Sequence, residues 1–144
     1  MAERLTTASA SETEALGARI AAGLVPGAVV TVSGEVGAGK TTLIRGACRA
    51  LGVEEPVTSP TFTIGQRYRA PGLWVSHLDL YRLADIEAED PALLDDYISA
   101  AGIAFVEWPA AAGRRLGRAS LDVRLSHAGG DSRDVELVSA SQHE

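Results

Sequence analysis

Cysteine is nearly absent from this chain of 144 residues, in which Cys48 is the only one. A lone cysteine excludes an internal disulfide, and its place in a helix-forming segment predicts a small core residue rather than a reactive thiol. Long apolar runs are also absent, and none approaches the roughly 20 residues that a membrane-spanning helix needs. The N-terminal residues lack a basic stretch followed by an apolar one, and they lack a small-residue cleavage site. We therefore expect a cytoplasmic protein.

Basic residues are outnumbered, because 13 lysines and arginines face 19 aspartates and glutamates, for a net charge of −6. A protein that binds nucleic acid by neutralising phosphates on its own needs the opposite sign. If RNA is involved, we expect a partner to hold it. The basic cluster Arg114, Arg115 and Arg118 is expected to be a solvated helix end, which the helix dipole favours. A contact with a partner or a phosphate group is the alternative.

The hydrophobic and charged contents, 46% and 22%, are those of an ordinary globular protein, and the length fits one domain over residues 1–144. A capping box, Ser11-x-x-Glu14, predicts the start of a helix that continues through Leu24. Apolar residues at helical spacing predict two more helices, at 41–51, closed by Gly52, and at 85–101, interrupted near Pro91.

Short β-branched and alternating segments predict strands at residues 28–32, 62–68, 73–79, 103–106, 121–125 and 135–137. Pro71-Gly72 is typical of a hairpin turn, and residues 128–131 predict the turn of a C-terminal antiparallel hairpin. Ser139 to Glu144 is expected to be a frayed tail. The order of elements predicts an α/β fold with a mixed β-sheet flanked by helices.

Residues 34–41, Gly-Glu-Val-Gly-Ala-Gly-Lys-Thr, match the P-loop pattern G-x-x-x-x-G-K-[ST] between a predicted strand and a predicted helix. Glycines in such a loop let successive N–H groups converge on a phosphate, and the helix N-terminus adds partial positive charge. Lys40 is then expected to reach the β- and γ-phosphate oxygens, and the Thr41 hydroxyl to bind Mg²⁺. The chain is thus predicted to be a P-loop NTPase-like protein. Its predicted nucleotide-binding residues are Glu35, Val36, Gly37, Ala38, Gly39, Lys40, Thr41, Thr42 and Trp108.

A P-loop also needs an acidic residue at a neighbouring strand end, and a group that orients or deprotonates the attacking water. Glu107 closes the apolar run 103–106 as a Walker-B acid closes its strand, and ligands of open α/β sheets bind beyond such strand ends. The alternative for Glu107 is an ordinary polar residue where a strand leaves the sheet. Asp79 ends the strand at 73–79, and its alternative is a helix N-cap.

His77 has three readings, as a base, as a partner for a phosphate or carboxylate, or as a satisfied polar group on a strand face. The last is expected for a histidine considered alone. With Asp79 and Glu107 it resembles a metal-ligand set, but the P-loop already accounts for Mg²⁺. Without cysteines or a second histidine nearby, a zinc site is not expected.

Two further segments are candidates for contact with a nucleotide. The rigid polar loop Ser59-Pro60-Thr61 is a candidate switch that senses the γ-phosphate, with a plain strand-entry turn as the alternative. Trp108 directly follows Glu107, so it is expected to report on the nucleotide even if it mainly packs in the fold.

Four segments together resemble one family. They are the loop 34–42, then Ser59-Pro60-Thr61-Phe62, then the HxDxYR sequence at 77–82, then Glu-Trp-Pro at 107–109. In this order and spacing the chain resembles the TsaE family, also called YjeE, over nearly its full length. The P-loop is generic, but the HxDxYR and EWP elements together are specific.

The resemblance implies a small bacterial ATPase of tRNA threonylcarbamoyladenosine biosynthesis, working with the TsaB–TsaD pair and reaching tRNA only through that complex. It implies ATP and Mg²⁺ binding by Lys40, Thr41 and Thr42, and a Mg²⁺ shell completed by Glu107. Asp79 would support hydrolysis, and the 59–62 loop would act as a switch.

Two other functions fit the residues without the resemblance. A small-molecule P-loop kinase would use Arg114, Arg115 and Arg118 as a lid, but the chain is short for separate lid and acceptor segments. A nucleotide-dependent interaction module would use bound ATP to set an assembly state, with hydrolysis as the reset. Transfer of phosphate to a metabolite would distinguish the kinase from the ATPase.

Overall fold

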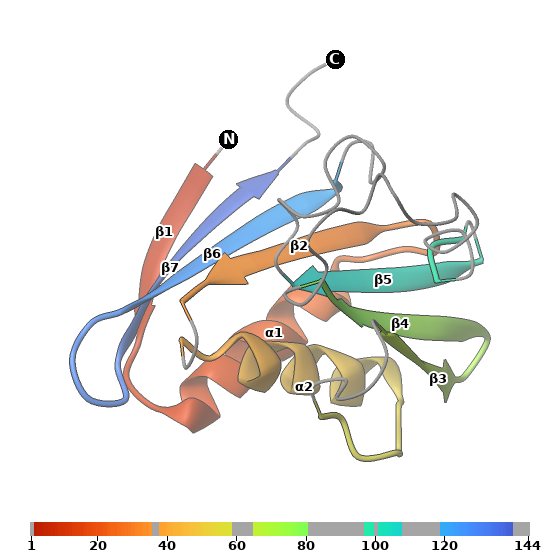
Figure 1. Cartoon of the computed structure of the whole chain (residues 1–144), viewed down its shortest axis with the longest axis horizontal. Coiled ribbons are helices and arrows are strands. Elements are labelled where there is room, and N and C mark those ends of the chain that lie inside the picture. Colours follow the sequence, from red (N-terminus) through yellow and green to blue (C-terminus); the bar gives the residue numbers. More distant parts are fainter. Residues whose placement is uncertain are drawn as a thin grey trace.

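The computed structural model describes residues 2–35, 38–58, 65–80, 97–99, 101–107 and 119–139. Within them the helices are α1 (Ala10–Ala22) and α2 (Lys40–Leu51). The strands are β1 (Ala2–Thr7), β2 (Val29–Gly34), β3 (Gly65–Ala70), β4 (Leu73–Asp79), β5 (Gly102–Glu107), β6 (Leu121–His127) and β7 (Arg133–Ser139). Both helices lie against the same face of the sheet (Figure 1).

One mixed sheet contains all the described strands, in the order β1-β7-β6-β2-β5-β4-β3. Strands β6, β2, β5 and β4 run parallel to one another, whereas β7 pairs antiparallel with β6 and β1, and β3 pairs antiparallel with β4. The predicted α/β fold with a mixed sheet is confirmed. Because the parallel strands run the same way, the ends of β2, β5 and β4 meet at one edge of the sheet.

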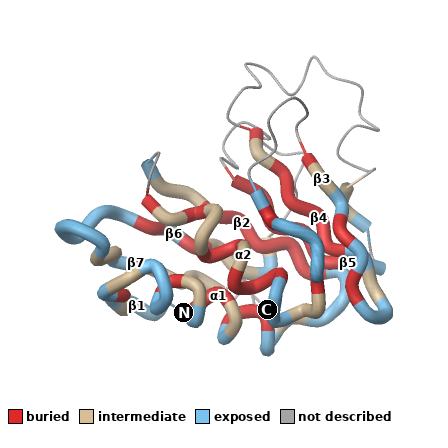
Figure 2. Tube along the Cα trace, turned by 90° about the horizontal axis from the view of Figure 1, so that it is seen from below, coloured by how far each residue is buried: buried red, intermediate tan, exposed pale blue. Residues whose placement is uncertain are grey.

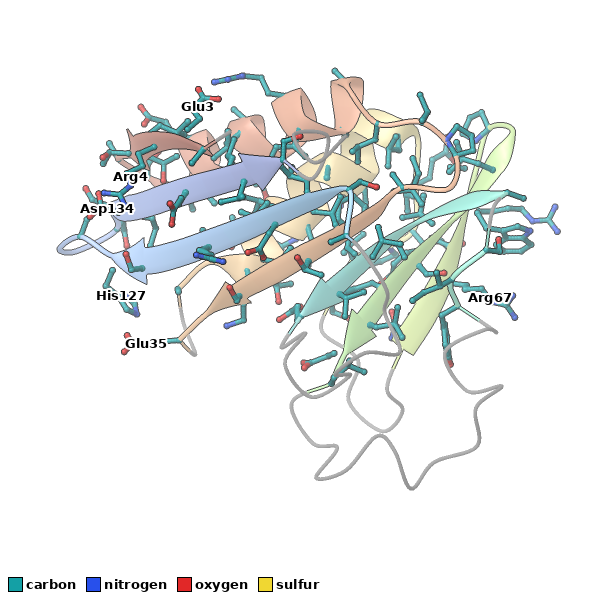
Figure 3. All side chains as sticks on the ribbon, turned by 90° about the horizontal axis from the view of Figure 1, so that it is seen from above. Glu3, Arg4, Glu35, Arg67, His127 and Asp134 are labelled. Carbon is teal, nitrogen blue, oxygen red and sulfur yellow. The ribbon has the colours of Figure 1, made fainter. Side chains whose placement is uncertain are left out.

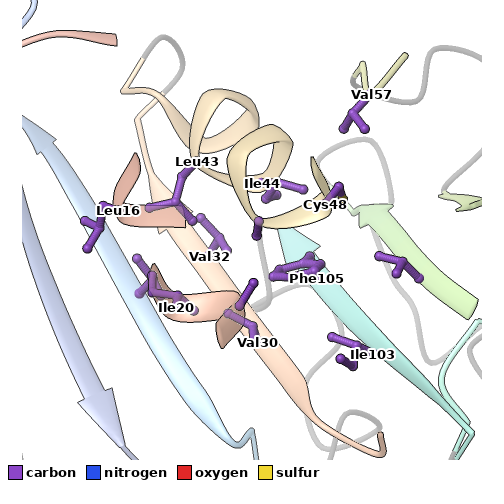
Figure 4. Close-up of a cluster of buried hydrophobic side chains, with 14 of the residues drawn as sticks. Leu16, Ile20, Val30, Val32, Leu43, Ile44, Cys48, Val57, Ile103 and Phe105 are labelled. Atoms are coloured by element: carbon purple, nitrogen blue, oxygen red, sulfur yellow. The ribbon is translucent and has the colours of Figure 1, made fainter. Parts of the chain in front are cut away.

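The central strands are the most buried part of the molecule, as Figure 2 shows. Every residue of β5 is buried, which agrees with its prediction from a continuous apolar run. The core between sheet and helices is built from aliphatic side chains around Phe105 (Figure 4). Cys48 belongs to this core, and burial raises the pKa of its thiol to about 12. The predicted core role of Cys48 is confirmed.

Local turn signals determine where several helices and strands end. Helix α2 ends as predicted at Gly52, whose φ of 101° favours glycine. Pro71 and Gly72 form the predicted turn between β3 and β4, and β4 has the predicted bounds. The C-terminal hairpin of β6 and β7 is also confirmed, but Ser139 belongs to β7 and not to a frayed tail. Residues 140–144 lie outside the described residues.

The N-terminal region differs from the prediction. Strand β1, which was not predicted, pairs with β7, and the N-cap of α1 is Ser9 rather than Ser11. The Ser9 hydroxyl accepts from the Glu12 N–H at 3.2 Å, and the Glu12 carboxylate accepts from the Ala8 N–H at 2.7 Å. Two overlapping S-x-x-E boxes compete, and the earlier one forms because β1 ends at Thr7, whose hydroxyl lies 2.7 Å from that of Thr13. The helix also ends before Leu24.

The helices α1 and α2 cross with their backbones in close approach, through a glycine on each. A Cβ atom built on Gly17 would lie 2.0 Å from the carbonyl oxygen of Leu43, and one on Gly46 would lie 2.0 Å from that of Glu14. Only glycine fits at such positions. The crossing therefore fixes α2 against the N-terminal helix.

Several predicted segments fall partly or wholly outside the described residues. Most of the helix predicted at 85–101 lies outside the described residues. Its predicted end is wrong, because the Ser99 carbonyl accepts from the Gly102 N–H in the turn that leads into β5. Positions 62–64 of the strand predicted at 62–68 lie outside, and β3 continues to Ala70. In the part of the chain that the structure describes, no helix is long and apolar enough to cross a membrane.

Candidate functional site

The glycine-rich loop 34–41 joins the end of β2 to the start of α2 at the edge where the parallel strands end. Gly34 has a φ of 151°, and a Cβ atom there would lie 2.6 Å from the carbonyl oxygen of Leu125 on β6. Gly39, the N-cap of α2, has a φ of 98°. Both positions therefore require glycine. Val36 and Gly37 lie outside the described residues.

Figure 3 locates this edge by two labelled residues, Glu35 directly after β2 and His127 at the end of β6. The two strands are parallel, with Gly34 opposite Leu125. The α2 helix begins here without an acidic residue in its first turn, so its positive end is not neutralised by its own side chains. The helix start thus suits an anion.

Lys40 is only 6% exposed and folds back over the loop. Its Nζ donates to the carbonyl oxygens of Gly34 at 2.7 Å and Glu35 at 2.9 Å. Burial lowers the pKa of Lys40, and the negative charges of Glu107 and Asp79 oppose that change. The same edge therefore holds an ammonium group beside two carboxylates.

Glu107 and Asp79 end the neighbouring strands β5 and β4 and lie opposite each other in the parallel register. Glu107 is 3% exposed. The Thr41 hydroxyl at the start of α2 donates to Glu107 Oε2 at 3.5 Å. The structure thus brings Lys40, Thr41, Asp79 and Glu107 together, as the sequence predicted, although no observation tests their catalytic or binding roles.

A hydroxyl and a carboxylate facing each other are oxygen donors of the kind that Mg²⁺ prefers. Among the described residues, no group of three or more His, Cys, Asp or Glu side chains is arranged to hold a metal ion. The donor set at Thr41 and Glu107 therefore fits a cation that takes its remaining ligands from phosphate oxygens and water.

His77 was given three alternatives, and the structure agrees with the second, a partner for a carboxylate. Its Nε2 lies 2.6 Å from Glu107 Oε2. The ring is fully buried. Parallel pairing of two strands that each end in an acidic residue is the signal that could have revealed this contact. In that register His77 lies diagonally across from Glu107.

Arg133 was not predicted at all. From the start of β7, its Nε donates to the Ala38 carbonyl in the loop at 3.1 Å, and its Nη1 donates to the carbonyls of Gly130 and Ser132, each at 2.8 Å. The guanidinium therefore ties the loop to the C-terminal hairpin. No local sequence pattern marks this contact.

The remaining candidates lie outside the described residues. They are the Ser59 to Phe62 loop, Trp108, and the cluster Arg114, Arg115 and Arg118. Their predicted roles stay predictions, as does the Asp79 N-cap for a segment beginning near Tyr81.

Fold and site define a class of protein: an α/β protein with a mixed sheet and a glycine-rich loop between a central parallel strand and a helix, flanked by acidic strand ends. Comparison with known proteins narrows this class. The family model described as "Threonylcarbamoyl adenosine biosynthesis protein TsaE" matches residues 7–135. The chain belongs to the TsaE family.

Individual relatives agree with this membership. The Bacillus subtilis "tRNA threonylcarbamoyladenosine biosynthesis protein TsaE" is 39% identical over 132 residues, 92% of this chain and 82% of the relative. The protein of the same name from Treponema pallidum is 30% identical, over 94% of this chain and 99% of the relative. The crystal structure of Bacillus subtilis YdiB superposes with a TM-score of 0.78 at 31% identity, covering 96% of this chain and 86% of that one.

Proposed function

We propose that this chain binds and hydrolyses ATP with Mg²⁺ as a component of tRNA threonylcarbamoyladenosine biosynthesis, acting with the TsaB–TsaD complex. The observation that carries the proposal is the meeting of Lys40, Thr41 and Glu107 at the glycine-rich loop, with the hydroxyl 3.5 Å from the carboxylate. The names of the relatives supply the pathway.

Each residue of the site has a proposed role that follows from its chemistry. The loop and the first turn of α2 would bind phosphate oxygens through backbone N–H groups. The Lys40 ammonium, now bound to loop carbonyls, would exchange them for the more strongly charged phosphate. Thr41 and Glu107 would hold Mg²⁺. When bound, the metal neutralises charge on the phosphate oxygens.

Asp79 is proposed to orient and deprotonate the attacking water. It ends β4 directly beside Glu107, so it lies next to the metal site. A carboxylate in that place suits proton acceptance. Glu107 therefore contributes to binding and Asp79 to turnover in this proposal.

A protein partner is proposed because the chain has a net charge of −6, which disfavours an independent nucleic-acid surface. Hydrolysis is expected to be slow for the chain alone and faster with TsaB–TsaD, which could supply or position a group over the γ-phosphate. Contact with tRNA would then occur through the complex.

The test measures phosphate release from ATP by the chain alone and with a purified TsaB–TsaD complex. Lys40→Ala should abolish release in both settings, whereas the control Arg49→Ala removes a positive charge from the exposed far end of the same helix and should not. Lack of nucleotide binding by the wild type would refute the proposal. So would tight tRNA binding by the chain alone at physiological salt.

A further inference from the structure

The most deeply buried polar contact at the site joins His77 to Glu107. His77 is 0% exposed, and its Nε2 lies 2.6 Å from Glu107 Oε2. Among the described residues its Nδ1 has no hydrogen-bond partner. A carboxylate accepts hydrogen bonds, so Nε2 carries the hydrogen and Nδ1 is left as a lone pair rather than a buried donor without an acceptor. The contact therefore defines one tautomer of the ring.

The same carboxylate oxygen faces the start of α2. Glu107 Oε2 accepts from the Thr41 hydroxyl at 3.5 Å and from His77 at 2.6 Å. The ring reaches Glu107 diagonally, because His77 on β4 pairs with Phe105 on β5. Movement of the carboxylate away from β4 would break the shorter of these bonds. His77 thus restricts the side chain that the proposed function assigns to Mg²⁺.

We propose that His77 is a positioning residue that holds the Glu107 carboxylate beside Thr41 for the Mg²⁺ bound with the nucleotide. The inference rests on the proposed function. Because the ring is fully buried, it acts through Glu107 and does not touch the nucleotide. Loss of a group that hydrogen-bonds to a metal-binding side chain commonly costs about 10–100-fold in metal affinity or activity.

The test compares two substitutions of nearly equal length and volume, His77→Gln and His77→Met. Glutamine places an N–H near the position of Nε2, whereas methionine fills the space without a donor. The measurement is the Kd of ATP by calorimetry with Mg²⁺ and with a chelator. The gain in affinity that Mg²⁺ provides should fall about 10–100-fold in His77→Met and stay within about threefold of wild type in His77→Gln.

A double-mutant cycle with Glu107→Gln shows whether the effect passes through Glu107. In the Glu107→Gln background, His77→Met should change the Mg²⁺-dependent gain by less than about twofold. An undiminished effect in that background would overturn the inference. So would equal behaviour of the Gln and Met variants, since that would show a role in filling space only.

A measurement on the wild-type protein covers the case in which His77→Met does not fold. The ¹⁵N chemical shifts of the His77 ring should report the Nε2–H tautomer, and a ring protonated only at Nδ1 would overturn the inference. Wild type that binds no ATP refutes the proposed function. Wild type that binds ATP with Mg²⁺ dependence, next to a folded His77→Met that matches it, refutes the positioning role alone.

Discussion

Adding a methyl group at the crossing of α1 and α2 should destabilise the protein, although alanine is the better helix former. At Gly17 the new Cβ atom would lie 2.0 Å from the Leu43 carbonyl oxygen and 2.9 Å from the Ala47 nitrogen. A carbon atom in weak contact with a carbonyl oxygen lies at about 3.3–3.6 Å. The helices must therefore separate by roughly 1.3–1.6 Å, because the groups in the way are backbone and cannot rotate aside.

Two opposing effects set the size of the change. Replacing glycine by alanine in a helix contributes about 1 kcal/mol of stability. Overpacking a tight core costs typically about 1–3 kcal/mol, and displacement of a whole helix places this contact at the upper end. We expect Gly17→Ala to lower the free energy of unfolding by about 2 kcal/mol, which for a chain of this size lowers Tm by roughly 5–10 °C. Gly46→Ala, which meets the Glu14 carbonyl at 2.0 Å, should behave alike.

The assay is thermal and urea unfolding followed by circular dichroism. Gly23→Ala is the matched control, because Gly23 has a φ of −99° and its Cβ atom would meet only the Ile20 oxygen, at 3.8 Å. It should stay within about 0.5 kcal/mol of wild type. An increase in stability for Gly17→Ala, as an isolated helix would show, would refute the close approach of the helices.

Three further outcomes are expected. Lys40→Ala should abolish ATP binding or hydrolysis in a folded protein, because the lysine acts as a point charge on the phosphates, and unchanged turnover measured by phosphate release would contradict the assignment. Glu107→Ala should weaken Mg²⁺-dependent binding, whereas Asp79→Ala should keep ATP affinity within several-fold of wild type and lose most hydrolysis. Calorimetry measures the affinity and phosphate release the turnover, and the opposite result would show that the two roles are exchanged. Arg133→Ala should weaken ATP binding by about 5–10-fold through loss of the bond to the Ala38 carbonyl, with little change in Tm, and an unchanged Kd would show that the loop holds its shape without it.

Elements bounded by their own turn residues were predictable from the sequence. Strand β4 has the predicted bounds because Gly72, with a φ of 77°, sets the hairpin turn before it. Helix α2 ends at the predicted Gly52 for the same kind of reason. Both signals lie within a few residues of the structure that they determine, so the chain around them is enough to find them.

Strand β1 could not be found in this way. All but two of its residues are exposed, so it carries no clear apolar alternation. Its partner β7 lies at the other end of the chain, with Leu5 opposite Val135. The pairing, not the local sequence, makes β1 a strand, and it also decides which of two capping boxes opens α1.

The site also has features that the local sequence predicts and features that it does not. The glycine-rich loop and the acidic ends of β4 and β5 follow from local motifs. The bond from His77 to Glu107 and the bond from Arg133 to Ala38 depend on which strands become neighbours. Strand order and register are properties of the whole sheet, so contacts that depend on them are not visible in any single segment.

The buried thiol of Cys48 makes the helix that follows the loop measurable by chemical labelling. With no other cysteine in the chain and a thiol that is 0% exposed, an alkylating reagent can react only when α2 opens. When reclosing is faster than reaction, the labelling rate is proportional to the population of the open form. A ligand that binds only the closed form should slow the reaction by the factor 1 + [L]/Kd, about 100-fold at 100 times Kd. One unmodified residue would then report nucleotide affinity in unlabelled protein, at concentrations too low for calorimetry.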